Sequence, residues 1–229
     1  MPARIAVLVS GGGTNLQALL DHFNERESAV ARVALVVGSR GGIGALTRAE
    51  QARVPTAVLD PAADLHAGKL QDALERAAVD LIVLAGYLRM IPAAVVARFR
   101  GRILNIHPAL LPAFGGAGMY GLRVHRAVIE SGARVSGATV HLVDERYDEG
   151  RIIAQWPVPV LPGDTSEMLA ARILPVEHAL LPAAVEMLLG GWSAEDGAAA
   201  DPLAFDIIRS PVPARVSLGI LAPLSSKLL

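Results

Sequence analysis

The sequence contains no cysteine. Disulfide bonds, thiolate metal sites and a thiol nucleophile are therefore excluded together, which fits a cytosolic enzyme. Aromatic residues make up only 4% of the chain and charged residues 19%, whereas hydrophobic residues make up 52%. A composition this apolar is typical of a globular protein with a large buried core, and it excludes a disordered chain.

The chain also lacks an excess of either charge, with 21 basic and 22 acidic residues and a formal net charge of −1. Binding to DNA or RNA relies on a positively charged surface, so we expect no nucleic-acid partner. A small anionic ligand remains compatible with this balance, because a few backbone N–H groups can bind a phosphate without net positive charge.

Long hydrophobic runs are missing as well. No stretch approaches the roughly twenty apolar residues of a membrane helix, and the N-terminal run is only about as long as a strand before the glycines begin. We therefore expect a soluble, cytoplasmic protein that acts on small molecules and has no membrane partner.

Apolar runs typical of buried strands alternate with segments of helical spacing in the first half of the chain. The expected strands cover residues 4–10, 30–39, 56–59, 80–86 and 103–107. This alternation predicts the α/β class, with a parallel sheet and helices on both faces. Ligands bind beyond the carboxyl ends of such strands, so segments 11–15, 86–89 and 105–107 should meet at one edge of the sheet.

The pattern changes after residue 120. A helix over residues 121–132 is followed by segments 134–144 and 151–160, which predict an antiparallel, hairpin-like addition to the sheet. Asp164 is expected to begin a long helix with Glu167 as its capping-box partner, and Pro175 and Pro182 should kink or restart that helix.

The domain organisation follows from these segments. Residues 1–195 are expected to form one catalytic domain, and residues 196–229 to form an apolar C-terminal extension of unknown role.

The segment SGGGTN (10–15) joins a strand to a helix through three glycines. Glycines let the backbone approach an anion closely, and a helix N-terminus favours negative charge. A tight strand–helix turn without a ligand explains the same residues equally well. Leu16 stands where the dinucleotide-binding pattern has its third glycine, and no Lys-Ser/Thr pair follows, so a monophosphate is the better hypothesis.

The segment NIHP (105–108) places an amide and an imidazole at a strand end. Asn105 and His107 are two residues apart on a strand, so their side chains share one face. A carboxamide can donate to a developing oxyanion and an imidazole can move protons, which favours a catalytic pair over a histidine of the core.

The loop DERYDEG (144–150) carries four acids and a glycine. A solvated turn is the ordinary explanation, and the spacing does not give the ligand pattern of an EF-hand. A carboxylate that reaches His107 would favour the imidazolium form and orient the ring. Spacing alone does not choose among Asp144, Glu145, Asp148 and Glu149.

Taken together, several motifs resemble the folate-dependent glycinamide ribonucleotide formyltransferases over roughly residues 4–190. These motifs are SGGGTNLQALL, LAGYLRMI, LNIHPALLPAF, GLRVHRAV, GATVHLVDERYDEGRIIAQ and PVEHALLP. The resemblance implies a Rossmann-like mixed sheet, mostly parallel, with the antiparallel addition at its C-terminal side. It also implies transfer of a formyl group from 10-formyltetrahydrofolate, as co-substrate, to the amine of 5-phosphoribosylglycinamide, without a metal.

The resemblance also assigns roles to individual positions. The catalytic set would be Asn105, His107 and Asp148, with a cationic His107 paired to Asp148. The residues that would hold the ribonucleotide are Gly13, Thr14, Asn15 and Glu177. The residues that would line the folate pocket are Leu88, Arg89, Met90, Ile91, Asp144 and Tyr147. Thr139 and His141 match a strand pair beside the site.

The sequence departs from the family pattern at Glu149, which replaces a frequent glycine, in the longer segment GGAGMYG (115–121), and at Pro175, just before Glu177. The upstream arginine that contacts folate in the family has no clean match. Three alternatives remain open beside the transferase. One is a formyltetrahydrofolate deformylase of the same fold, another is a Rossmann-type nucleotide-binding oxidoreductase, and the last is a non-catalytic phosphate-ligand sensor. The assembly is expected to be a monomer or a homodimer.

Overall fold

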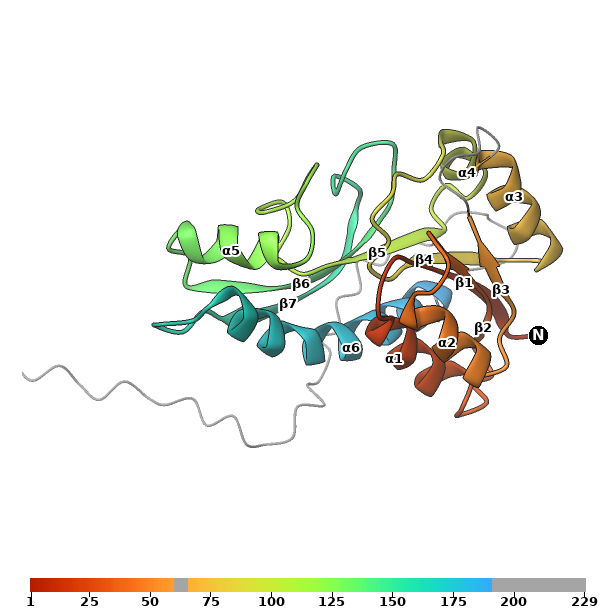
Figure 1. The fold of residues 1–229 in the computed structure, drawn as a ribbon, viewed down its shortest axis with the longest axis horizontal. Helices are drawn as coiled ribbons and strands as arrows, with labels where there is room; N and C mark the ends of the chain where they lie inside the picture. Colours follow the sequence, from red (N-terminus) through yellow and green to blue (C-terminus); the bar gives the residue numbers. More distant parts are fainter. Residues whose placement is uncertain (60–65, 191–229) are drawn as a thin grey trace, which may run out of the picture.

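The structure is a computed structural model, and it describes residues 1–59 and 66–190. Seven strands form one mixed sheet in the order β3-β2-β1-β4-β5-β6-β7 (Figure 1). The strands are β1 (Ala3–Val9), β2 (Ala31–Gly38), β3 (Thr56–Val58), β4 (Leu81–Leu84), β5 (Ile103–His107), β6 (Val135–Leu142) and β7 (Ile152–Pro159). Strands β1 to β5 pair in parallel, and β6 and β7 are antiparallel additions. The predicted fold class is confirmed.

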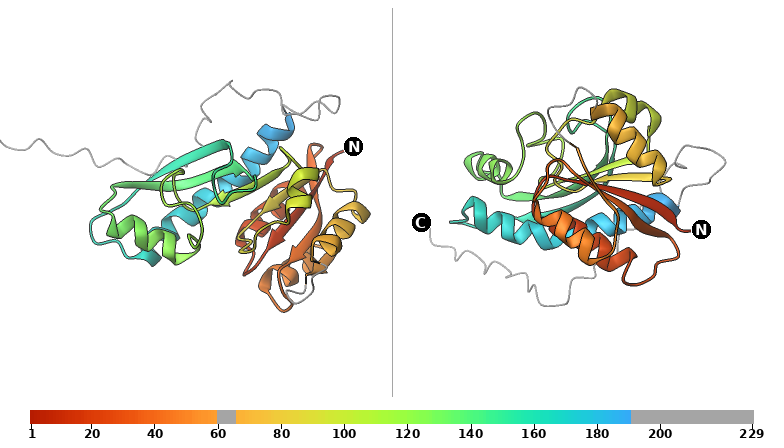
Figure 2. Two further views of the ribbon diagram at one scale, coloured as in Figure 1. Left: turned by 90° about the horizontal axis from the view of Figure 1, so that it is seen from above. Right: turned by 45° about the vertical axis from the view of Figure 1, so that its right-hand side comes forward.

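Helices cover both faces of this sheet. They are α1 (Thr14–Phe23), α2 (Gly44–Gln51), α3 (His66–Arg76), α4 (Ala93–Arg98), α5 (Leu122–Glu130) and α6 (Ser166–Gly190). Figures 1 and 2 show α3 and α4 on one face, with α1, α2 and α6 on the other. The long α6 crosses beneath the sheet and packs against β5, β6, β7 and α1.

Strand β1 shows why the sheet is buried on both sides. Its residues are almost uniformly apolar, and successive side chains of a strand point to opposite faces. Ile5, Val7 and Val9 belong to the core beneath α1 and α6. Ala6 and Leu8 belong to the core beneath α3 and α4. Burial of each such large aliphatic side chain is worth about 1.5–3 kcal/mol, so both layers hold the strand tips in place.

The start of α6 differs from its prediction. Helix α6 begins after Thr165, whose hydroxyl accepts a hydrogen bond from the Met168 amide at 3.3 Å. Asp164 instead accepts two hydrogen bonds from Arg172, at 2.6 and 2.7 Å. The assignment of Asp164 as the first residue was therefore wrong, because its carboxylate serves an ion pair one step before the cap.

The prolines of α6 do not restart it. One helix of 25 residues continues through Pro175 and Pro182. Among the described residues, α6 alone is long and apolar enough to span a membrane by length and composition. The expectation that no stretch qualifies was thus wrong for this helix. Several of its apolar residues, such as Ile173 and Leu181, are buried in the core, whereas Met168 is exposed.

The predicted extension over residues 196–229 lies outside the described residues, as does the end of the predicted domain after residue 190.

Candidate active site

The carboxyl ends of β1, β4 and β5 meet at one cleft of about 410 Å³, which we call the central cleft. This is the meeting point that the strand order predicts, because parallel strands end at the same edge of the sheet. Its lining residues include Asn15, Gly86–Arg89, Asn105–Pro108, Gly116–Gly121, His125, Tyr147, Asp148 and Glu177. Each of the three polar strand ends thus contributes residues to it.

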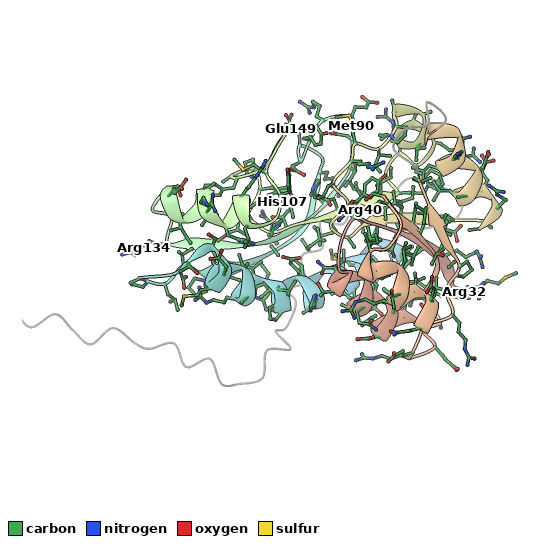
Figure 3. The ribbon with its side chains drawn as sticks, viewed as in Figure 1. Arg32, Arg40, Met90, His107, Arg134 and Glu149 are labelled. Atoms are coloured by element: carbon green, nitrogen blue, oxygen red, sulfur yellow. The ribbon has the colours of Figure 1, made fainter. Side chains whose placement is uncertain are left out.

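The glycine turn after β1 leaves the first turn of α1 without a side-chain cap. Gly13 has φ of 78°, and a Cβ there would lie 2.7 Å from Ala45, so only glycine fits without a shift. The neighbouring Gly11 and Gly12 line a shallow hollow together with Arg40, which Figure 3 labels. Asn15 lines the central cleft, whereas Gly13 and Thr14 are not among its lining residues. Uncapped amides at a helix N-terminus suit an anion.

Asn15 and Glu177 form the buried polar pair at this end of the cleft. The Asn15 Nδ2 donates a hydrogen bond of 2.6 Å to Glu177 Oε2, and Asn15 Oδ1 is buried without a partner. Burial raises the pKa of Glu177, and the hydrogen bond from Asn15 only partly offsets that effect. Glu177 therefore holds a proton at higher pH than an ordinary glutamate.

His107 is 3% exposed at the end of β5 (Figure 3). Its Nε2 lies 2.8 Å from the carbonyl oxygen of Phe114, so Nε2 carries a hydrogen, because a carbonyl can only accept. Its Nδ1 lies 3.6 Å from Asp148 Oδ2. The ring is thus held between a backbone oxygen and a carboxylate.

Burial lowers the pKa of His107, and this effect outweighs the raising influence of Asp148 and of the Phe114 carbonyl. A lowered pKa favours the neutral ring at neutral pH over the cationic His107 that the resemblance implies. A neutral ring with its hydrogen on Nε2 has a bare Nδ1 beside a carboxylate. The lone pair of Nδ1 can accept a proton, and the adjacent Asp148 carboxylate stabilises the cation that forms.

Asp148 adopts a left-handed backbone conformation with φ of 55°, and its carboxyl group points into the site. Burial raises the pKa of Asp148. Contacts with His141, with the Gly116 amide and with His107 lower the pKa by more, so the net shift is downward. The Gly116 N–H donates to Asp148 Oδ2 at 2.9 Å. Asp148 is the loop acid that reaches His107.

Asn105 and His141 complete the cluster. Asn105 Nδ2 lies 3.0 Å from His141 Nε2 and 3.5 Å from Asp148 Oδ1. His141 Nδ1 lies 2.9 Å from the carbonyl of Leu142 and therefore carries a hydrogen. In the neutral ring, Nε2 accepts from Asn105, and a protonated Nε2 would instead donate to Asp148. His141 thus contacts two of the three predicted catalytic residues, Asn105 and Asp148.

Thr139 lies two residues before His141 on β6, opposite His107 of β5, and its hydroxyl contacts the loop rather than the cleft. Its hydroxyl donates to the Ala109 carbonyl at 2.6 Å and accepts from the Leu111 amide at 3.1 Å. It therefore fixes the start of the loop that carries Phe114 and Gly116.

A smaller side pocket of about 140 Å³ opens next to the central cleft. The two share Tyr87, Arg89, Asn105, Tyr147 and Asp148. Of the six residues assigned to the folate pocket, five line the side pocket, namely Arg89, Met90, Ile91, Asp144 and Tyr147. Leu88 lines the central cleft instead and is 56% exposed.

The sequence did not predict the roles of the Phe114 carbonyl and the Gly116 amide. The direction of a backbone group depends on the path of the loop, which the sequence does not show. Sequence reasoning also missed His125, which is buried on α5 and lines the central cleft. The signal for His125 was available, since it shares the buried face of a short helix with Val124 and Val128.

The model of the formyl transferase family matches residues 3–185. The chain belongs to the formyl transferase family. It is 46% identical over 189 residues to a chloroplastic phosphoribosylglycinamide formyltransferase of Vigna unguiculata, with 81% of this chain and 60% of the relative covered. This chain thus spans less than two thirds of that relative.

Other formyl transferases are similar over more of their own length. The phosphoribosylglycinamide formyltransferase of Haemophilus influenzae is 38% identical, with 82% of this chain and 88% of the relative covered. The crystal structure of glycinamide ribonucleotide transformylase 1 from Symbiobacterium toebii superimposes with a TM-score of 0.77 at 43% identity, covering 83% of this chain and 89% of that one. The resemblance drawn from the motifs is confirmed, and the oxidoreductase alternative finds no support in it.

Within the part of the chain that the structure describes, no group of three or more histidine or acidic side chains is arranged to hold a metal ion. The expected absence of a metal stays a prediction.

Proposed function

We propose that this chain transfers a formyl group from 10-formyltetrahydrofolate to the amine of 5-phosphoribosylglycinamide, a step of purine biosynthesis. The observation that carries the proposal is the position of Asn105, His107 and Asp148 around the junction of the central cleft and the side pocket. Two reactants held in adjoining pockets gain the proximity that a transfer reaction needs. The relatives named above support the choice of substrates.

The two ends of the combined site suit the two molecules. The ribonucleotide phosphate binds at the uncapped N-terminus of α1 over Gly13, Thr14 and Asn15, and Glu177 holds the sugar portion nearby. The folate ring enters the side pocket between Ile91 and Tyr147. Its formyl group then faces the catalytic cluster.

The neutral amine of the ribonucleotide attacks the formyl carbon and forms a tetrahedral intermediate. The bare Nδ1 of His107 takes the proton that the amine loses, and Asp148 and the Phe114 carbonyl stabilise the resulting imidazolium. One N–H of Asn105, the one at 3.5 Å from Asp148, turns to the developing oxyanion. The cation and the amide together stabilise that oxygen.

The intermediate then collapses. The imidazolium of His107 gives its proton, directly or through water, to the leaving N10 of the folate as the carbon–nitrogen bond breaks. The oxyanion returns to a carbonyl, which leaves formylated ribonucleotide, tetrahydrofolate and a neutral His107. His107 therefore becomes cationic during the reaction, by the proton it removes from the substrate.

The remaining expectations stay predictions. These are a cytoplasmic location, a monomeric or homodimeric assembly, and the absence of nucleic-acid and membrane partners.

A turnover assay tests the proposal directly. Purified protein is mixed with 10-formyltetrahydrofolate, and the folate absorbance is followed with and without 5-phosphoribosylglycinamide. We expect consumption only when the ribonucleotide is present. Equal consumption without it would establish the deformylase alternative, and no consumption at all in either mixture would reject both enzymes.

A further inference from the structure

His125 is a buried polar side chain that the mechanism above does not use. It lies in the first half of α5, and 4% of its surface is exposed. Its helix neighbours on the buried face, Val124 and Val128, are fully enclosed and apolar. An apolar side chain would satisfy that packing without the cost of burying an imidazole, so packing alone gives no reason for a histidine.

The hydrogen bonding of His125 is incomplete. Nδ1 is shut off from water and has no partner, and no hydrogen bond to either ring nitrogen is found within residues 1–59 and 66–190. Among buried backbone groups, an N–H without an acceptor is rarer than a carbonyl without a donor, and we assign the ring hydrogen by the same preference. The hydrogen therefore belongs on Nε2, which is not enclosed as Nδ1 is.

His125 lines the central cleft, together with residues of the loop before α5. It does not line the side pocket. Burial, together with the nearby His107, lowers the pKa of His125. The ring is therefore a neutral donor, close to the reacting centre and on the ribonucleotide side.

We propose that His125 Nε2–H donates a hydrogen bond to the amide carbonyl oxygen of the glycinamide portion of the ribonucleotide and so positions the attacking amine. A neutral donor matches a neutral carbonyl, whereas the phosphate is served by the amides at the start of α1. His125 is a specificity residue in this account, because it distinguishes an acyl amide from a simple amine. The proposal rests on the function given above and deepens it.

Two substitutions that place an amide nitrogen at different ring positions test this role. The amide nitrogen of glutamine reaches the place of an imidazole Nε2, and that of asparagine reaches the place of Nδ1. We expect His125→Gln to keep the KM for the ribonucleotide within about threefold, and His125→Asn to raise it about tenfold, the equivalent of one hydrogen bond. The KM for 10-formyltetrahydrofolate should stay unchanged in both, and kcat should change less than the ribonucleotide KM.

His178 supplies the matched control. It also has a buried ring nitrogen without a partner, Nε2, but it does not line the central cleft. The His178→Gln and His178→Asn variants should leave the ribonucleotide KM unchanged. Equal KM values in His125→Gln and His125→Asn, or a rise confined to the folate KM, would overturn the proposal.

A measurement on the unsubstituted protein covers the case in which a variant fails to fold. In a long-range proton–nitrogen correlation spectrum, the His125 Nε2 signal should shift when 5-phosphoribosylglycinamide is added and should stay in place with inorganic phosphate alone. No shift with the ribonucleotide, although it binds, would overturn the role of His125. Failure of the ribonucleotide to bind at all would instead reject the proposed function.

Discussion

Two carboxyl groups, those of Asp148 and Glu177, line the central cleft, and their surroundings move their pKa values apart. Asp148 contacts His107, His141 and the Gly116 amide, and its pKa lies below the usual value. Glu177 is more deeply buried, has one hydrogen bond from Asn15, and its pKa lies above the usual value. One cleft therefore holds a carboxyl group that ionises at lower pH than usual and another that ionises at higher pH than usual.

This difference separates two tasks. The Asp148 carboxylate stabilises the imidazolium that His107 becomes, whereas Glu177 can bind a sugar hydroxyl as an acceptor when it is ionised and as a donor when it is protonated. Pairs of acids that environment pushes apart commonly divide chemistry and binding in this way. Burial alone does not decide the outcome, because both groups are buried and the number of donors around each one sets the sign.

The largest effect is expected from Asp148→Asn. The imidazolium loses its counter-ion, so kcat should fall about a hundredfold to a thousandfold, the range seen when one stabilising group of this kind is removed. Steady-state turnover with both substrates measures the loss. The neighbouring Glu149→Gln, in which an exposed acid paired to Arg146 is changed, is the control and should keep normal turnover. Near-normal kcat in Asp148→Asn, with the fold intact, would remove Asp148 from the mechanism.

A smaller effect is expected from Glu177→Gln. Glutamine imitates the protonated form that burial favours, so the KM for the ribonucleotide should rise less than tenfold while kcat changes little. The difference from the unsubstituted protein should shrink further as the pH falls toward the range in which Glu177 is protonated. A loss of kcat as large as that of Asp148→Asn would show that the two acids do not divide their tasks.

The smallest effect concerns stability, and the pH dependence of the stability has opposite signs for the two acids. Stability from Asp148, whose pKa is lowered by folding, is present above the ordinary aspartate pKa and is lost as the pH falls through the folded value. Stability from Glu177, whose pKa is raised, is present below the ordinary glutamate pKa and is lost as the pH rises through the folded value.

Thermal unfolding at neutral pH measures both signs. Glu177→Gln should raise Tm and Asp148→Asn should lower it, each by roughly 2–4 °C for a change of about 1 kcal/mol. Parallel curves at pH 4 and pH 7 give the pH dependence. Shifts of the same sign in both variants would contradict the comparison.

Much of the fold was predictable from the sequence. The apolar period placed β5 at residues 103–107, as the structure does, and the strand order brought Asn105 and His107 to the same edge as Asn15. These predictions succeed because a buried strand needs an apolar run and parallel strands end together. The predicted start of α6 was wrong because Asp164 and Thr165 are both good caps, and the spacing does not show that Asp164 pairs with Arg172 of the same helix while Thr165 caps it.

The detailed site was less predictable. Four acids of the loop were equivalent by spacing, and the resemblance alone selected Asp148. The structure supplies the physical reason. The left-handed backbone conformation of Asp148 turns its carboxyl group toward the site, whereas Glu149 pairs with Arg146 at the surface. The carbonyl of Phe114 and the amide of Gly116 could not be predicted, because their directions depend on the path of the loop and not on side-chain type.

The difference between the pKa values of Asp148 and Glu177 can be measured by a carbon-13 NMR titration of the side-chain carboxyl groups in the unsubstituted protein. The account predicts that Asp148 titrates below the ordinary aspartate range and that Glu177 titrates above the ordinary glutamate range in the same sample. A Glu177 that titrates at or below the ordinary value, or an Asp148 that titrates above its own, would contradict it.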